Sequence, residues 1–163
     1  MPASHPWWRG TRGEWYVIVQ AGLLALVGFG PTTGLGLAPW GPPAAWVSLG
    51  LGLILAGAGG WLALAGLLHL GANLTVLPHP KDDAALVETG AYSLVRHPIY
   101  GGLILAAFGW ALLRGSPLGL IYGVILLVFF DLKSRREERW LAAKFAAYPA
   151  YQRRVKKLIP FVY

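Results

Sequence analysis

Residues 98–132 read PIYGGLILAAFGWALLRGSPLGLIYGVILLVFFDL. They form two apolar runs, 98–113 and 118–132, separated by the four residues RGSP at 114–117. Each run approaches the roughly 20 apolar residues that cross a bilayer as an α-helix. Glycine, serine and proline are residues that form tight turns. The segment therefore predicts a helical hairpin in a membrane.

Two further apolar stretches precede this hairpin, from about residue 15 to 30 and from Ala44 to about Leu70. The 163-residue chain is 56% hydrophobic and 13% charged, whereas a soluble domain is about 25% charged. We therefore predict an all-α integral membrane protein with about four transmembrane helices. Arg9 and Arg12 before the first stretch also fit a cleaved signal peptide. No small-x-small cleavage site follows, which favours a retained helix.

The distribution of charge predicts how the bundle lies in the membrane. Nine of the 14 Lys and Arg residues lie from Lys133 onward, and Lys81 and Arg96 lie between the second and third stretches. By the positive-inside rule, both termini, the middle loop and any site beside them face the cytoplasm. The basic tail is typical of contact with anionic lipid headgroups. It belongs to no nucleic-acid-binding module, so we expect no nucleic-acid partner.

The sequence after Leu132 becomes polar without a break in helical pattern. This pattern predicts that the last membrane helix continues as an interfacial amphipathic helix, which ends or kinks near Pro149. Residues 151–158 are expected to form a final basic helix. The small residues at 50–60 follow no predicted strand, as a dinucleotide-binding fingerprint requires. They instead favour close helix packing, including a possible homo-oligomer contact.

Several classes of site are excluded by composition. The chain has no cysteine, which excludes disulfides, thiolate zinc sites and cysteine nucleophiles. Its four histidines show no metal-ligand spacing, so no metal site is predicted. Asp131 lies close to the predicted membrane segment, where a carboxylate needs a partner. Lys133, Arg135 or Arg96 can supply one.

The segment 88–102 concentrates side chains that bind ligands. Pro98 suits the first turn of a helix, which places Arg96 and His97 at the helix entrance, where the helix dipole attracts anions. Tyr92 and Tyr100 add aromatic faces and hydroxyls, and Gly101 leaves room for a ligand or a neighbouring helix. The alternative is that these polar residues anchor the helix at the membrane interface.

An acidic pair, Glu137-Glu138, is the second chemical element. The predicted hairpin returns this pair to the side of the membrane that holds Arg96 and His97. There it could bind an ammonium group, ribose hydroxyls or a basic side chain. The alternative is a solvated helix in which both glutamates pair with neighbouring arginines.

These elements together resemble the isoprenylcysteine carboxyl methyltransferases and the related membrane phospholipid methyltransferases. The similarity covers about residues 74–160, half of the chain. It is carried by Gly90-Ala91-Tyr92, Val95-Arg96-His97-Pro98-Ile99-Tyr100-Gly101-Gly102, Arg136-Glu137-Glu138, and Phe145, Tyr148, Tyr151, Val155 and Ile159-Pro160. The length of the chain allows one membrane domain over 1–163, with N-terminal helices at 1–73. The resemblance implies a methyltransferase-like core and tail at 74–160.

The same resemblance implies a S-adenosylmethionine site and a methyl-transfer reaction. Arg96, Glu137 and Glu138 would be the catalytic residues. The full cofactor-binding set it implies is Leu86, Val87, Tyr92, Arg96, His97, Pro98, Tyr100, Gly101, Glu137 and Glu138. Membrane lipid is an expected partner, and the acceptor is expected to be lipophilic or lipidated, with a carboxylate, amine or thiol as the methylated group. A NADPH-dependent sterol-type reductase and a non-enzymatic membrane scaffold are the alternatives.

Overall fold

A computed structural model describes residues 13–73 and 85–163. The described residues are helical and contain no β-strand beyond isolated bridges, which confirms the all-α prediction. Arg9, Arg12 and Lys81, on which part of the predicted orientation depends, lie outside the described residues. The helices are α1 (Glu14–Phe29), α2 (Ala44–Leu70), α3 (Ala91–Leu94), α4 (Pro98–Leu113), α5 (Pro117–Lys144) and α6 (Tyr148–Arg154), with a short 3₁₀ turn at Gly71–Asn73.

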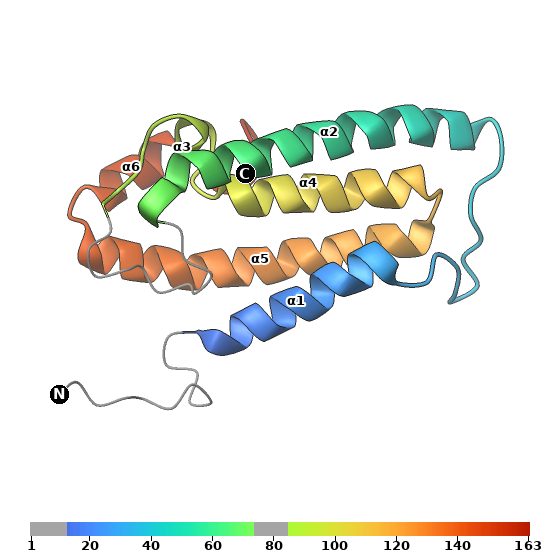
Figure 1. The fold of residues 1–163 in the computed structure, drawn as a ribbon, viewed down its shortest axis with the longest axis horizontal. Coiled ribbons are helices and arrows are strands. Elements are labelled where there is room, and N and C mark those ends of the chain that lie inside the picture. The colour runs from blue at the N-terminus through green and yellow to red at the C-terminus, as the bar shows by residue number, and fades with distance from the viewer. Residues whose placement is uncertain (1–12, 74–84) are drawn as a thin grey trace.

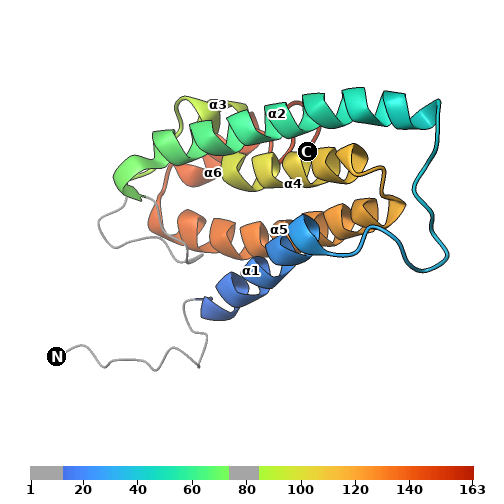
Figure 2. The same ribbon diagram turned by 45° about the vertical axis from the view of Figure 1, so that its right-hand side comes forward.

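The four long helices lie roughly side by side (Figure 1). Helix α2 packs along α4, α4 packs along α5, and α1 packs mainly on α5. The short helices α3 and α6 gather at one end of the bundle, near the start of α4 and the end of α5 (Figures 1 and 2). The segments that carry the predicted chemistry are therefore collected at this end.

The turn between α4 and α5 is built by three consecutive residues. Gly115 adopts a φ of 59° just after α4, a conformation that glycine takes without steric cost. The Ser116 hydroxyl accepts a hydrogen bond from the Gly119 amide at 2.9 Å and so caps α5. Pro117 begins that helix. The sequence thus turns the chain sharply and sends α5 back along α4.

Small residues bring α2 and α4 close together. A Cβ atom added at Gly59 would lie 2.5 Å from the Ala106 amide nitrogen and from the Gly102 carbonyl oxygen. Real side chains do not approach backbone atoms so closely, so only glycine fits at this contact. The small-residue stripe predicted to mediate helix packing therefore does so within the chain.

Helices α2 and α5 are long and apolar enough to cross a membrane, by length and composition. Apolar helices α1 and α4 are shorter, with 16 residues each. Large apolar side chains on α2 point away from the bundle: Trp61 is 62% exposed and Leu68 is 72% exposed. A core helix of a water-soluble protein would bury these side chains, so their exposure favours lipid as the surrounding medium.

The C-terminal segment differs in detail from its prediction. Helix α5 ends at Lys144, before Pro149, which instead lies in the first turn of α6. Proline is well tolerated there because the first turn donates no intrahelical bonds. The final helix covers Tyr148–Arg154 rather than 151–158, and Val155 is extended.

Candidate functional site

The entrance of α4 is held in place by the C-terminal tail. The Arg96 amide donates to the Lys156 carbonyl oxygen at 2.8 Å, and the His97 amide donates to the Lys157 carbonyl oxygen at 3.0 Å. This pairing resembles one rung of a parallel ladder. It fixes the backbone of Arg96 and His97 just before Pro98 begins the helix.

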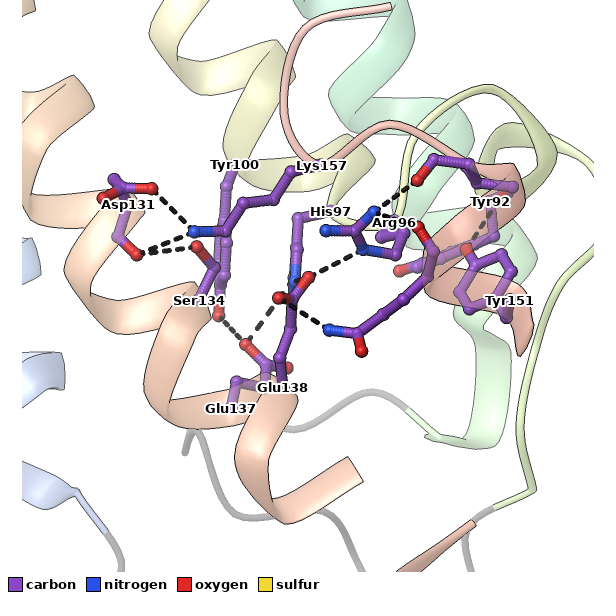
Figure 3. A network of polar contacts seen from close by, with 12 residues as sticks. Tyr92, Arg96, His97, Tyr100, Asp131, Ser134, Glu137, Glu138, Tyr151 and Lys157 are labelled. Carbon is purple, nitrogen blue, oxygen red and sulfur yellow. Dashed lines mark hydrogen bonds and ion pairs between the residues drawn. The ribbon is translucent and has the colours of Figure 1, made fainter. Parts of the chain in front are cut away.

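Arg96, His97 and Glu138 form a buried polar cluster (Figure 3). Arg96 Nε lies 2.7 Å from Glu138 Oε1, and His97 Nε2 lies 3.2 Å from the same oxygen. Gln152 Nε2 donates to Glu138 Oε2 at 3.1 Å. Arg96 Nη1 also donates to the carbonyl oxygens of Gln152 and Val155. Glu138 therefore joins α5, the α4 entrance and α6.

This burial argues against the interface-anchor alternative. The side chain of His97 is 5% exposed, and those of Arg96 and Glu138 are each 11% exposed. Residues that anchor a helix at lipid headgroups keep their polar ends in water. The acidic pair also contacts distant segments rather than the arginines beside it, so the alternative of local helix pairing does not describe these two glutamates.

Glu137 has a different environment from its neighbour. Its Oε2 accepts a hydrogen bond from the Tyr100 hydroxyl at 3.0 Å and lies 3.8 Å from His97 Nδ1. The Tyr100 ring stacks on His97 with centroids 5.5 Å apart and on Phe130 at 4.6 Å. Glu137 is thus held by one hydroxyl on a rigid aromatic stack, and its side chain remains 22% exposed.

A cavity of about 310 Å³ lies beside this cluster, within the size range of ligand pockets. Seven of the predicted cofactor-binding residues line it, whereas Pro98, Gly101 and Glu138 do not. The seven are Leu86, Val87, Tyr92, Arg96, His97, Tyr100 and Glu137. The structure therefore separates the predicted set into residues that face the cavity and residues behind it.

The residues behind the cavity have packing roles. A Cβ at Gly101 would collide with the Leu158 carbonyl oxygen, so this glycine admits the C-terminal tail rather than a ligand. Pro98 is fully buried, beside Gly66 of α2. Of the two uses predicted for Gly101, close packing of protein is the one observed.

Tyr148 provides an unpaired polar group. Its hydroxyl is buried and has no hydrogen-bond partner within the described part of the chain, although the residue lines the cavity. Burial raises the pKa of this hydroxyl well above its ordinary value, so the proton is retained. Buried hydroxyls nearly always have a partner, so Tyr148 fits a cavity that binds a ligand with polar groups.

Several cavity residues had no predicted role in the site: Gln20, Leu67, Leu70, Asn73, Ala85, Ile99, Lys133, Leu141, Phe145, Tyr148 and Tyr151. Two of them carried a usable signal. Gln20 interrupts the first apolar stretch, and Lys133 directly follows the last one. Polar side chains at such positions mark functional sites by default. The apolar members carried no comparable signal because any membrane helix contains such residues.

Asp131 anchors the tail that supports the site. Lys157 Nζ lies 2.6 Å from Asp131 Oδ1, and the Tyr163 hydroxyl donates to the same oxygen at 2.7 Å. Arg135 Nε lies 2.8 Å from the other carboxylate oxygen. Arg135 was among the predicted partners, whereas Lys157 and Tyr163 were not. The tail supplies the backbone carbonyls that hold Arg96 and His97, so this anchor supports the site indirectly.

No group of three or more His, Asp or Glu residues able to hold a metal ion occurs in the described ranges 13–73 and 85–163. The side chains of Arg96, His97, Glu137 and Glu138 are instead engaged with one another, with Tyr100 and with Gln152. The arrangement offers one carboxylate, several hydroxyls, aromatic faces and an apolar wall. Such a set suits an organic ligand that carries an ammonium group and an aromatic base.

Comparison with known proteins agrees with this arrangement. The model of the phospholipid methyltransferase family matches residues 47–148. A protein-S-isoprenylcysteine O-methyltransferase from Saccharomyces cerevisiae is 40% identical over 84 residues, 50% of this chain and 35% of the yeast protein. Proteins of the same name from Mus musculus and Homo sapiens are 30% and 31% identical over 121 residues, 72% of this chain and 42% of each relative.

The chain spans less than half the length of these relatives. The family match includes all of α4 and α5 and the whole Arg96–Glu138 cluster. It covers well over half of the 163 residues. The protein therefore belongs to the phospholipid methyltransferase family.

Proposed function

We propose that the protein is a membrane methyltransferase that uses S-adenosylmethionine to methylate a lipophilic acceptor. The observation that carries the proposal is the cavity at the α4 entrance, where Glu137, Tyr148 and the Tyr100 stack meet an apolar wall. The relatives support it, since each is named a protein-S-isoprenylcysteine O-methyltransferase.

The polar groups of the cavity complement those of the cofactor. Glu137 has carboxylate lone pairs left for an ammonium group or ribose hydroxyls, because one oxygen accepts a single bond from Tyr100. The unpaired Tyr148 hydroxyl can donate a hydrogen bond to a ribose or carboxylate oxygen of the cofactor. Leu86 and Val87 provide an apolar surface for adenine. When bound, S-adenosylmethionine supplies an electrophilic methyl group on a sulfonium.

Two residues of the cluster have supporting roles in this proposal. Glu138 already accepts bonds from Arg96, His97 and Gln152 and does not line the cavity. It therefore positions Arg96 and His97. Arg96 reaches the cavity while held by Glu138 and two carbonyl oxygens. Most of the rate acceleration would come from such positioning, because methyl transfer is an in-line displacement.

The proposed arrangement in the membrane has four helices, α1, α2, α4 and α5, with α4 and α5 as a helical hairpin. The cavity then lies at the cytoplasmic end, where α5 loses its apolar character after Leu132. A lipophilic acceptor would approach from the bilayer, and its reacting group would reach the cofactor at the interface. The single domain 1–163, with its methyltransferase-like core at 74–160, is part of the same proposal.

The proposal is tested by calorimetric titration of the purified protein in detergent with S-adenosylhomocysteine, using NADPH as the control. We expect saturable binding of S-adenosylhomocysteine at one site per chain and no binding of NADPH. NADPH binding without S-adenosylhomocysteine binding would support the reductase alternative instead. Binding of neither ligand by folded protein would contradict an enzyme of either kind.

A further inference from the structure

The C-terminal loop, residues 158–163, presents apolar side chains on the outside of the molecule. Two amides at the start of the loop donate to the Tyr163 carbonyl oxygen, each at 2.7 Å, and so close it. At its tip, Phe161 is 88% exposed and Val162 is 71% exposed. Phe161 holds a φ of 65°, in the left-handed region that is unfavourable for a bulky residue. The fold therefore keeps an apolar tip outward at a cost in backbone energy, as functional positions often do.

The C-terminal loop is anchored where α5 leaves its apolar part. The Tyr163 hydroxyl donates to Asp131 Oδ1 at 2.7 Å, and the apolar part of α5 ends at the next residue, Leu132. Asp131 lies about 21 Å along the helix from its start at Pro117, in a hydrocarbon core about 30 Å thick. In the proposed arrangement of the helices, the apolar tip therefore lies in the cytoplasmic half of the bilayer.

Exposed cations lie just before this loop. Lys157 turns inward and pairs with Asp131 at 2.6 Å. Successive side chains of an extended segment point to opposite sides, so Lys156 points outward, where it is exposed. Arg153 of α6 is exposed too, and neither cation forms an ion pair within the described part of the chain. From Lys133 onward, nine Lys and Arg residues face only two glutamates, so this surface complements negative charge.

The segment that carries these cations also holds the cavity wall. The carbonyl oxygen of Lys156 accepts from the Arg96 amide at 2.8 Å. The Arg96 guanidinium donates to the carbonyl oxygens of Gln152 and Val155, on either side of Arg153. Lys156 thus has an outward ammonium on its side chain and a bond to the site on its backbone. A ligand that fixes the tail from outside also fixes Arg96.

We propose that the C-terminal loop, with Arg153 and Lys156, binds anionic phospholipids of the cytoplasmic leaflet, and that the bound lipid steadies the cofactor cavity. Phe161 and Val162 contact the acyl chains, and the two cations pair with headgroup phosphates. A zwitterionic headgroup binds less well because it carries a positive group of its own. The lipid site stands on the geometry of the tail, whereas its effect on the cofactor rests on the proposed function.

The first experiment measures which lipid contacts the loop. Val162→Cys carries a nitrobenzoxadiazole fluorophore, on a chain with no other cysteine, in phosphatidylcholine vesicles. Nitroxide-labelled phosphatidylglycerol or nitroxide-labelled phosphatidylcholine is the quencher, and quenching against its mole fraction gives the relative affinity of the two lipids. We expect the anionic lipid to be preferred at least about fivefold, the factor that one cation near an anionic surface contributes.

Variants separate this site from the general charge of the cytoplasmic surface. Lys156→Gln should lower the preference about two- to fivefold, and Lys156→Arg should retain it. Arg139→Gln is the matched control, because it removes an exposed cation of α5 about 12 Å along the helix from Asp131. This separation exceeds the Debye length, so the preference should change by less than about twofold. The same fluorophore on Leu53→Cys, at an exposed position of α2, should show no preference.

The second experiment measures S-adenosylhomocysteine binding by calorimetry in vesicles of each composition. We expect wild-type protein to bind it at least about threefold more tightly with phosphatidylglycerol present than in phosphatidylcholine alone, because two ligands that favour one state help each other reciprocally. Lys156→Gln should bind it equally in both vesicles, because the variant keeps the backbone bond to Arg96 and loses only the charge. Unchanged thermal unfolding of the variant reports an intact fold.

Equal quenching by the two lipids at Val162 would overturn the lipid site, as would an unchanged preference in Lys156→Gln. Quenching by neither lipid would also overturn it, in favour of a protein partner or a second copy of this chain on the loop. Equal S-adenosylhomocysteine affinity of wild-type protein in both vesicles would overturn the link to the cavity. A lipid preference without any S-adenosylhomocysteine binding would overturn the proposed function and support the lipid site.

Discussion

At the scale of single residues, the two adjacent glutamates have distinct environments. Glu138 is held by three side chains from two other segments. Glu137 accepts from Tyr100 alone and faces the cavity. Adjacent positions on a helix point about 100° apart, which explains how one glutamate can support the cluster while the next faces a ligand.

Substituting each glutamate by glutamine should therefore give different defects. Glu137→Gln should weaken S-adenosylhomocysteine binding about 10- to 100-fold, because a charge-assisted contact worth about 1.5–3 kcal/mol is lost. Its thermal unfolding should be close to wild type. Glu138→Gln leaves Arg96 and His97 without their carboxylate and should lower the unfolding free energy by about 3 kcal/mol. Calorimetry and circular dichroism in detergent measure the two effects. Equal destabilisation by both variants would contradict this division.

The sequence predicted the residue types of the site better than their contacts. Arg96, His97 and Glu137 were identified from their positions at helix ends and from a family pattern. The Arg96–Glu138 ion pair joins residues 42 positions apart, and no local pattern specifies such a contact. Tyr148 entered only as part of the resemblance, and its unpaired hydroxyl depends on how α6 folds back over the cavity.

At the scale of helices, the bundle depends on a few glycines that have no substitute. Gly59 of α2 meets the backbone of α4 so closely that even alanine would collide with Ala106 and Gly102. Gly57, two residues earlier, faces away from the contact, and a Cβ atom added there would have no neighbour within 4 Å. The two positions look alike in sequence and differ only in the helix face they occupy.

Gly59→Ala should destabilise the protein by about 1–3 kcal/mol, the usual cost of overpacking. Gly57→Ala is the matched control on the same helix. It should leave stability unchanged or raise it by up to about 1 kcal/mol, because alanine favours helix over glycine. Thermal unfolding in one detergent compares the two. A destabilising Gly57→Ala together with a neutral Gly59→Ala would contradict this packing, because it would mean that α2 contacts α4 through the face that carries Gly57.

The helices themselves were well predicted where a physical rule sets their limits. Ala44–Leu70 and Pro98–Leu113 have the predicted bounds because turn residues flank apolar runs. The prediction was wrong at the end of α5, where Pro149 was expected to end the helix and instead starts α6. Proline is compatible with both positions. Packing of Tyr148 and Tyr151 into the core decides between them, since both are almost fully buried.

At the scale of the whole molecule, the charge pattern predicts which end of the bundle faces the cytoplasm. The chain contains no cysteine, so single cysteines can be introduced and labelled without background. Arg139 on α5 and Ala38 between α1 and α2 are both exposed. They lie toward opposite ends of the bundle, since α5 returns from the α4–α5 turn toward the site.

A membrane-impermeant maleimide should therefore label Ala38→Cys in intact cells and label Arg139→Cys only after the membrane is opened. The physical reason is the positive-inside rule, which keeps the basic segment after Lys133 in the cytoplasm. Both variants should react equally in detergent, which controls for local accessibility. The reverse pattern in intact cells would invert the proposed orientation and put the cavity on the other side of the membrane.

The central claim is that the chain itself catalyses methyl transfer, and the most direct measurement is transfer of a labelled methyl group. Purified protein in detergent is incubated with methyl-labelled S-adenosylmethionine and S-farnesyl-3-mercaptopropionate, with the Glu137→Gln variant as the control. We predict label in the acid as a methyl ester that base releases, and at least tenfold less product with the variant. Folded wild-type protein that leaves the acid unlabelled would contradict the account.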